Sequence, residues 1–164
     1  MTLTNEQIDA AVNWWGRALK APSYNQLSPE ERAADPDSAR QEFMGRALVS
    51  MLRTQHPITD EQIDTFKTEL RKVLDGTSDL QVKLSGPELR ELAWLFDGYL
   101  GVDYGPCITL RTCAERAGID DSHFPIKTGM RVNRSDGRVS VGCGYGAPWV
   151  YVNPDGSTAE LVTP

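Results

Sequence analysis

The stretch Phe124–Val152, FPIKTGMRVNRSDGRVSVGCGYGAPWVYV, is the long segment of this 164-residue chain in which side chains follow a two-residue period. Side chains alternate between apolar and polar with a period of two residues on both sides of Arg134–Gly137, a sequence typical of a turn. This pattern predicts an antiparallel β-hairpin with one face packed against the rest of the protein. The residues expected to share the buried face are Ile126, Thr128, Met130, Val132, Val139, Val141, Cys143 and Tyr145.

The hairpin is expected to continue into further short strands. Trp149–Val152 predicts a third strand, Asn153–Gly156 is a second turn sequence, and Thr158–Val162 predicts a fourth strand. Leu80–Leu84 is a candidate for a fifth strand. Consecutive hairpins of this kind predict an antiparallel β-meander of three to five strands.

Three expected helix starts share a capping box with a hydrophobic staple. In each, a threonine or serine stands three residues before a Gln or Glu, so that the two side chains satisfy backbone N–H groups at the start of the helix. The three sequences are Leu3–Ile8 (LTNEQI), Ile58–Ile63 (ITDEQI) and Leu84–Leu89 (LSGPEL). The first two also form the repeat LTNEQID and ITDEQID, which indicates either a common way of starting a helix or an old duplication.

About five helices are predicted, most of them ahead of the hairpin. Two further segments, Ser38–Thr54 and Pro106–Gly118, space their apolar residues as helices do, and the helix that starts at Ser85 is expected to use Tyr99 in its apolar stripe. Helices followed by hairpins predict an α+β fold. We therefore expect an N-terminal helical layer packed on a C-terminal antiparallel β-meander.

The composition is that of an ordinary globular protein, with 40% hydrophobic and 24% charged residues. We expect a single domain over residues 1–164, mainly helical in 1–121 and mainly β in 122–164. No apolar run reaches the roughly 20 residues of a membrane helix, and the N-terminus does not resemble a signal peptide. The three cysteines have no paired spacing, so we expect reduced thiols, a cytoplasmic location and no membrane contact.

The net charge of −6 disfavours binding to duplex nucleic acid, because phosphate contacts dominate that affinity. The charge is unevenly distributed along the chain. Residues 1–121 hold 13 basic and 20 acidic side chains, whereas residues 122–164 hold four basic and three acidic side chains. A mildly basic C-terminal part therefore follows an acidic N-terminal part.

The polar face of the hairpin gathers cationic side chains. Arginine forks match phosphate oxygens, and Gly142 and Gly144 would let a ligand approach the backbone closely. The aromatic residues nearby offer rings on which a base could stack. The alternative is a solvated strand face whose charges prevent edge pairing. The predicted ligand-binding residues are Lys127, Arg131, Arg138, Tyr145 and Trp149.

A thiol enzyme is a further alternative. Cys107 follows Pro106 at an expected helix N-terminus, where the helix dipole favours the thiolate. His123 would then act as the base, with Asp103 or Asp121 orienting it. The competing interpretation is that Cys107 is a small apolar residue in contact with its neighbours.

No metal site and no cofactor are predicted. Cys107 and Cys113 would lie on opposite sides of one helix, which does not suit a zinc site. The glycines of Gly142–Gly146 alternate, but no helix follows them and Pro148 intervenes, so they do not form a dinucleotide fingerprint.

Trp14 and Tyr24 are candidate interface residues. Trp14 lies off the apolar stripe of the first predicted helix, and Tyr24 lies in a polar segment that follows it. Exposed aromatic side chains of this kind anchor protein interfaces. The alternative is that the segment folds over Trp14.

The segments LGVDYGPCITLRTCAERAGI, FPIKTGMRV and VGCGYGAPWVYV resemble a group of small accessory proteins of phages and prophages. In that group, a capped helical N-terminal part precedes a VDYGP segment, an FPxKT-like strand and a GYGA ending. The resemblance implies an inhibitor of host defence in the cytoplasm of a bacterial host, and it brings no catalytic signature.

These observations lead us to expect a non-enzymatic, oligomeric binding protein that sequesters a small anionic signal of nucleotide type. The sequence contains no recognisable set of catalytic residues. This suits the expected function, because sequestration requires tight binding of the ligand and no chemical reaction. Two alternatives remain. One is an inhibitor that binds a host defence protein such as a CRISPR complex, and the other is the thiol enzyme centred on Cys107.

Overall fold

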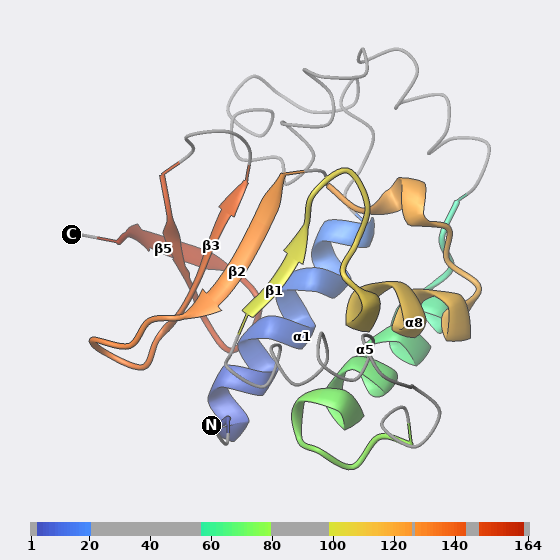
Figure 1. Cartoon of the computed structure of the whole chain (residues 1–164), viewed down its shortest axis with the longest axis horizontal. Helices are drawn as coiled ribbons and strands as arrows, with labels where there is room; N and C mark the ends of the chain where they lie inside the picture. Colours follow the sequence, from blue (N-terminus) through green and yellow to red (C-terminus); the bar gives the residue numbers. More distant parts are fainter. Residues whose placement is uncertain (1–2, 21–56, 80–98, 126, 144–147, 163–164) are drawn as a thin grey trace.

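The computed structural model of the chain describes residues 3–20, 57–79, 99–125, 127–143 and 148–162. In this part of the chain, helices pack on one antiparallel sheet, so the predicted α+β class is confirmed. The sheet is a meander in which each strand pairs with the next in the order β1-β2-β3-β4-β5 (Figure 1). Its strands are β1 (Tyr99–Val102), β2 (Thr128–Val132), β3 (Val139–Cys143), β4 (Val150–Val152) and β5 (Thr158–Leu161).

The β2–β3 hairpin forms as the alternation predicts. Met130 pairs with Val141 and Val132 pairs with Val139, which places these apolar side chains on one face. Met130 and Val141 are almost fully buried. The turn between the strands is closed by hydrogen bonds from the Asn133 N–H to the Arg138 carbonyl and from the Gly137 N–H to the Asn133 carbonyl.

The sequence analysis assigned Tyr99 to a helix, and this prediction is wrong, because Tyr99 is the first residue of strand β1. Tyr99 pairs with Arg131, and Leu100 and Val102 point into the core. The spacing of the preceding apolar residues suits a helix, but residues 99–102 also alternate, and the open edge of β2 supplies backbone partners. Because β1 precedes the last described helix, the helices and strands are not fully separated along the chain. The predicted elements Ser38–Thr54, Leu80–Leu84 and the helix start at Ser85 lie outside the described residues.

The described α-helices are α1 (Asn5–Lys20), α5 (Asp60–Leu74) and α8 (Ile108–Ala117), and a short 3-10 helix, η2 (Asp121–His123), follows α8. Helix α1 lies between the sheet and α5, and α8 packs on α5 and β1 (Figure 1). None of these helices is long and apolar enough to cross a bilayer, within the residues that the structure describes. Helix α8 ends as predicted at Gly118, which has a left-handed φ of 70°, with the buried Ile119 after it.

The position of α1 explains why Trp14 is not an exposed anchor. A single apolar stripe was expected, but a helix packed on both sides buries more than one face. Trp14 is only 4% exposed, so the premise of an exposed Trp14 is wrong. Its ring meets Trp15 edge-on at 4.9 Å, and Trp15 in turn contacts Phe124 at 6.0 Å. Tyr24 lies outside the described residues.

The repeated sequences LTNEQID and ITDEQID form equivalent sets of hydrogen bonds in the structure. Thr4 with Gln7 and Thr59 with Gln62 form the predicted capping boxes. Each glutamine then donates its amide N–H to the carbonyl of a glycine in a different element, Gly137 at 2.7 Å and Gly118 at 2.9 Å. Both glycines have a positive φ of 70°. The repeat therefore joins each helix start to a left-handed turn elsewhere in the fold.

The turn between β4 and β5 packs directly on α1. Asn13 donates its side-chain amide to the Pro154 carbonyl at 2.7 Å. Gly156 has a φ of 84°, and a Cβ added to it would lie 2.6 Å from the Asn13 carbonyl carbon and 2.7 Å from the Trp14 nitrogen. Only a residue without a side chain fits this contact.

Candidate ligand-binding face

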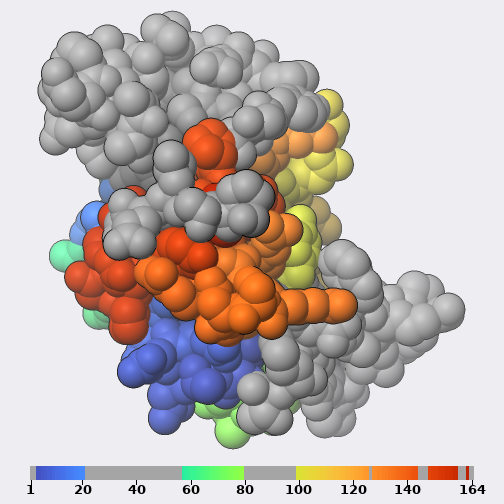
Figure 2. Space-filling view, turned by 90° about the vertical axis from the view of Figure 1, so that its left-hand side faces the viewer, coloured from blue at the N-terminus to red at the C-terminus, as the bar shows by residue number. Residues whose placement is uncertain are grey.

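The face of the sheet that points away from the core carries the strongest candidate site. Side chains of successive residues in a strand point to opposite faces, and the register aligns the residues that share this outer face. Figure 2 shows atoms of the β2–β3 region, in orange, at the surface on this side of the molecule. We define the outer face by Tyr99, Gly101, Gly129, Arg131, Ser140, Gly142, Trp149 and Tyr151.

Three glycines form a row across the centre of the outer face. Gly101 pairs with Gly129, and Gly129 pairs with Gly142. A Cβ on Gly142 would lie 3.1 Å from Cε2 of Trp149, and a Cβ on Gly129 would lie 3.2 Å from Cη2 of the same indole. The indole therefore lies on the strand backbone, in space that side chains would otherwise fill.

The phenol ring of Tyr99 covers the other end of the glycine row. A Cβ on Gly101 would lie 2.7 Å from Oη of Tyr99, and a Cβ on Gly129 would lie 3.3 Å from the same atom. Tyr99 and Trp149 thus meet above Gly129. The two rings, both half-buried, form one aromatic surface over three strands.

Arg131 is stacked on this surface. Its guanidinium carbon lies 4.3 Å from the centre of the Trp149 ring. A cation–π contact of this kind contributes about 0.5–1 kcal/mol at an exposed site, and it fixes the plane of the guanidinium. Among the described residues, no carboxylate forms an ion pair with Arg131. Arg131 is exposed, so its N–H groups can be reached from solvent.

Arg138 forms a second cation–ring pair on the same face. Its guanidinium carbon lies 3.6 Å from the centre of the Tyr151 ring. The Tyr151 hydroxyl donates to Asp136 at 2.7 Å, and the backbone N–H of Arg138 donates to the same carboxylate at 2.9 Å. The Tyr151 hydroxyl, and then the Arg138 N–H, hold the pKa of Asp136 below its ordinary value. Asp136 therefore carries a negative charge close to Arg138. This charge partly offsets the attraction of the Arg138 guanidinium for anions.

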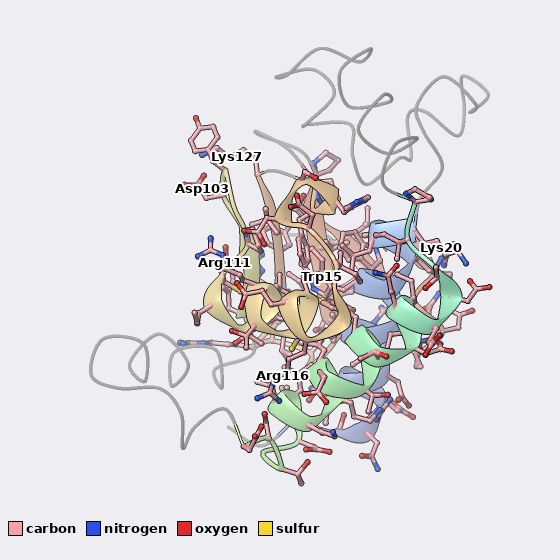
Figure 3. The ribbon with its side chains drawn as sticks, turned by 90° about the vertical axis from the view of Figure 1, so that its right-hand side faces the viewer. Trp15, Lys20, Asp103, Arg111, Arg116 and Lys127 are labelled. Atoms are coloured by element: carbon pink, nitrogen blue, oxygen red, sulfur yellow. The ribbon has the colours of Figure 1, made fainter. Side chains whose placement is uncertain are left out.

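Lys127 does not belong to this face, which corrects the predicted alignment of three cations. Lys127 has a φ of 53° and lies just outside β2, where its N–H donates to the Asp103 carbonyl. Its ammonium group forms an ion pair with the Asp103 carboxylate and lies 4.1 Å from the centre of the Tyr104 ring. Figure 3 shows Lys127, which directly precedes β2, beside Asp103, which directly follows β1.

The polar face of the hairpin is also less open to solvent than the alternation predicts. Ser140 is fully buried and donates its hydroxyl to Oδ1 of Asn133 at 2.8 Å, and Gly142 is buried under Trp149. An aromatic cover therefore replaces the expected row of solvated side chains in the middle of the sheet. Tyr145, also a predicted ligand-binding residue, lies outside the described residues.

Two of the residues of the thiol-enzyme alternative, Asp103 and Asp121, form ion pairs with other side chains. Cys107 is the N-cap residue of α8 and is half-buried, and His123 is buried with 5% exposure. The two carboxylates expected to orient the histidine have other partners, since Asp103 pairs with Lys127 and Asp121 pairs with Arg111 at 3.1 Å.

Cys113 is buried and adds no reactive thiol. Burial raises the pKa of Cys113 to about 12, so this thiol stays protonated. The described part of the chain has no cluster of His, Cys, Asp and Glu side chains able to hold a metal ion.

A groove of about 430 Å³ lies between the start of α1 and the two hairpin turns. Arg138 lines it together with Glu6 and Asp136. With the two carboxylates of Glu6 and Asp136 in its lining, this groove is a poorer anion site than the part of the outer face around Arg131.

Tyr99, Tyr151 and the glycine row are the parts of this site that sequence reasoning missed. Trp149 and Tyr151 are two residues apart in a predicted strand, so the alternation places them on one face and could have revealed Tyr151. No local signal pairs Gly101 with Gly129, because that pairing depends on β1. The comparisons with known proteins find no matching family model, no matching curated protein and no matching solved structure.

Proposed function

We propose that this protein is a non-enzymatic binding protein that holds a small anionic ligand of nucleotide type on the outer face of its sheet. One observation carries the proposal: the guanidinium of Arg131 is stacked 4.3 Å above an indole that itself lies on a glycine row. This arrangement fixes a cation and aromatic rings side by side on a flat, partly exposed surface. A ligand with both an anionic group and a planar ring could contact the cation through the first and the aromatic rings through the second.

The chemistry of Arg131 suits a phosphate. A guanidinium presents its N–H groups in a planar fork that binds two phosphate oxygens, and the stacked contact leaves that edge open. Because the indole already restricts the side chain, less conformational entropy is lost when a ligand binds. The partly exposed Tyr99 ring beside it can stack on a base, as aromatic platforms in nucleotide-binding proteins do.

The charge of the whole chain limits the size of the ligand. A net charge of −6 repels a long polyanion, whereas a ligand with one to a few phosphates responds mainly to the nearby arginines. Sequestration of a small nucleotide signal, the role that the resemblance to phage accessory proteins implies, fits this limit. The alternative, a protein-binding inhibitor that uses the acidic helical part and Trp14, keeps only the acidic part as support, because Trp14 is buried.

Calorimetric titration with nucleoside monophosphates, pyrophosphate-bridged dinucleotides and cyclic dinucleotides tests the proposal. We expect at least one of these ligands to bind, and Arg131→Gln to weaken its binding by at least about tenfold, because a charge-assisted hydrogen bond contributes about 1.5–3 kcal/mol. Arg134→Gln is the matched control. It removes the same charge from an exposed position in the turn of the same hairpin and should change the affinity by less than about twofold.

Two results would reject this function. The first is the absence of binding heat, and of any shift in melting temperature, with every ligand of the panel. The second is equal weakening by Arg131→Gln and Arg134→Gln, which would mean that only the overall charge matters.

A further inference from the structure

We infer that the groove at the start of α1 binds an organic cation, an ammonium or guanidinium group carried on a short aliphatic chain. The residues that line this groove are not among those that define the outer face, so the inference does not rest on the proposed function. The groove has a volume of about 430 Å³. Pockets for small ligands range from about 300 to 1,000 Å³. The groove is therefore large enough for one aliphatic side chain or a ligand of similar size.

Two hydrogen bonds hold the walls of the groove in place. Gln7 donates its side-chain amide to the Gly137 carbonyl at 2.7 Å, which joins the start of α1 to the turn between β2 and β3. Asn13 donates to the Pro154 carbonyl at 2.7 Å, which joins the same helix to the turn between β4 and β5. Figure 2 shows atoms of α1, in blue, next to those of the β2–β3 hairpin, in orange, at the surface. Because its walls are already joined, the groove loses little conformational entropy when a ligand binds.

Two carboxylates lie on the segments that these bonds join. Glu6 directly precedes Gln7 and Asp136 directly precedes Gly137, so the hydrogen bond between Gln7 and Gly137 brings both carboxylates to the same groove. Within the described parts of the chain, the exposed Glu6 carboxylate has no hydrogen bond and no ion pair. It is therefore open to a cation that enters the groove.

The Asp136 carboxylate is oriented by its neighbours but is not saturated by them. Its Oδ1 accepts the backbone N–H of Arg138 at 2.9 Å, and its Oδ2 accepts the Tyr151 hydroxyl at 2.7 Å. Each carboxylate oxygen has two lone pairs, so each can accept one hydrogen bond more. Asp136 is thus a fixed acceptor for the N–H groups of an ammonium or guanidinium ion.

Two positive charges oppose a cation in the groove, and the carboxylates exceed them. Arg138 also lines the groove, but its guanidinium is stacked 3.6 Å from the centre of the Tyr151 ring. The N-terminus of α1 carries a partial charge of roughly +0.5. The capping box already engages the Thr4 and Gln7 N–H groups there. Two full negative charges remain in excess, and the net charge of −6 adds to the attraction.

The rest of the lining suits an aliphatic chain. Ala10, Val139 and Val152 are buried residues that line the groove. Lysine and arginine side chains place their methylene stems on apolar surface of this kind, while their charged ends stay at polar groups. A metal ion is a poorer match, because the described residues contain no group of three or more His, Cys, Asp and Glu side chains able to hold one. The lining thus matches both parts of an aliphatic cation.

The test is a titration of the full chain followed by NMR at the backbone amides of Gly137 and Asn153. The ligands are lysine with both ends capped, 1,4-diaminobutane, and capped norleucine, which has the same aliphatic chain without the ammonium group. We expect saturable shifts with both cations and none with norleucine. Tighter binding of the capped lysine would assign the site to a side chain of a partner protein, and tighter binding of the diamine would assign it to a free amine.

Three variants show whether the groove carboxylates hold the cation. Glu6→Gln combined with Asp136→Asn should weaken binding by at least about fivefold, because two contacts between charges are lost. Glu61→Gln is the matched control, because it removes the same charge from the equivalent, exposed position of the repeat at the start of α5, and it should change the affinity by less than about twofold. Arg138→Gln should strengthen binding by about two- to threefold, since it removes the opposing charge.

Three results would overturn the inference. The first is the absence of saturable shifts with both cations, and the second is equal binding of capped norleucine. The third is an unchanged affinity in the double variant, or weaker binding after Arg138→Gln, in proteins whose melting temperatures show that they are folded. Nucleotide binding at the outer face is measured separately, so the failure of either site leaves the other standing.

Discussion

Gly142 has a structural role that its neighbours in β3 do not share. Its Cα supports the indole of Trp149, and a Cβ would lie 3.1–3.3 Å from three atoms of the ring. Val141 and Cys143, on either side of it, point to the opposite face. The absence of a side chain at this one position therefore determines where the indole, and the guanidinium stacked on it, can lie.

Gly142→Val should displace Trp149 from the sheet. The branched side chain needs the space that the indole occupies, so we expect a red-shifted tryptophan emission, ligand binding at least tenfold weaker, and a free energy of unfolding lower by about 1–3 kcal/mol. Fluorescence and urea unfolding measure these changes. In a Trp149→Phe background the same substitution should leave the emission unchanged, which assigns the shift to this indole. An unshifted spectrum in the original background would contradict the described contact.

At the scale of elements, the two glutamines of the repeat show how a helix start is joined to a distant turn. Gln62 accepts a hydrogen bond from the Thr59 N–H through Oε1 and donates to the Gly118 carbonyl through Nε2. Gln7 makes the equivalent pair of bonds to Thr4 and Gly137. One side chain therefore caps its own helix and at the same time positions a left-handed turn.

Gln62→Glu separates these two contributions. A carboxylate can still accept from the Thr59 N–H, but it cannot donate to the Gly118 carbonyl, and it places a charge beside that oxygen. We expect the free energy of unfolding to fall by about 1 kcal/mol, as for the loss of one hydrogen bond. Urea unfolding measures this difference. Gln7→Glu should have a similar effect at Gly137, and full stability in both variants would show that the donated bonds are dispensable.

The sequence predicts elements well where one local rule suffices. The capping boxes at Thr4 and Thr59, the alternation around Met130 and the glycine C-cap at Gly118 are all local patterns, and the structure confirms them. Tyr99 was wrongly placed in a helix, because its strand exists only by pairing with β2. The alignment of Lys127 with the two arginines failed for a related reason, since its backbone turns out of the strand at a positive φ.

At the scale of the whole molecule, a charged cluster joins α5, α8 and the turn after α5. Arg116 donates to Glu69 at 2.6 Å and lies 2.9 Å from Asp79, and Lys72 donates to Glu69 at 2.9 Å. The hydrogen bond from Arg116, followed by the one from Lys72, holds the pKa of Glu69 below its ordinary value of 4.5. The Glu69 side chain is only 13% exposed, so solvent weakens these contacts less than at the surface.

The stability of the protein should therefore depend on Glu69 in acid. Because the pKa of Glu69 is lower in the folded state, its charged form stabilises the fold above about pH 4.5, and this contribution is lost as the pH falls through the lowered pKa. Glu69→Gln should reduce the free energy of unfolding at pH 7 by about 1–2 kcal/mol and flatten its fall between neutral and acid pH.

Urea unfolding from pH 7 to pH 3 checks this dependence. Glu115→Gln, at an exposed position of α8, removes the same charge and should change the stability at pH 7 by less than about 0.5 kcal/mol. A Glu69→Gln variant with the acid dependence of the original protein would show that other carboxylates control it.

The contact of Gly156 with α1 has a consequence for the order in which the molecule is assembled. The hydrogen bond from Asn13 to Pro154 joins residues 141 positions apart, so the first helix packs against the last turn. A nascent chain that ends before Pro154 lacks this contact, although all of α1 has been synthesised. Contacts between such distant residues close late because of the entropy of the intervening loop. During translation, the surface on which Asn13 and Trp14 rest is therefore completed only after the turn that holds Pro154 and Gly156 has left the ribosome.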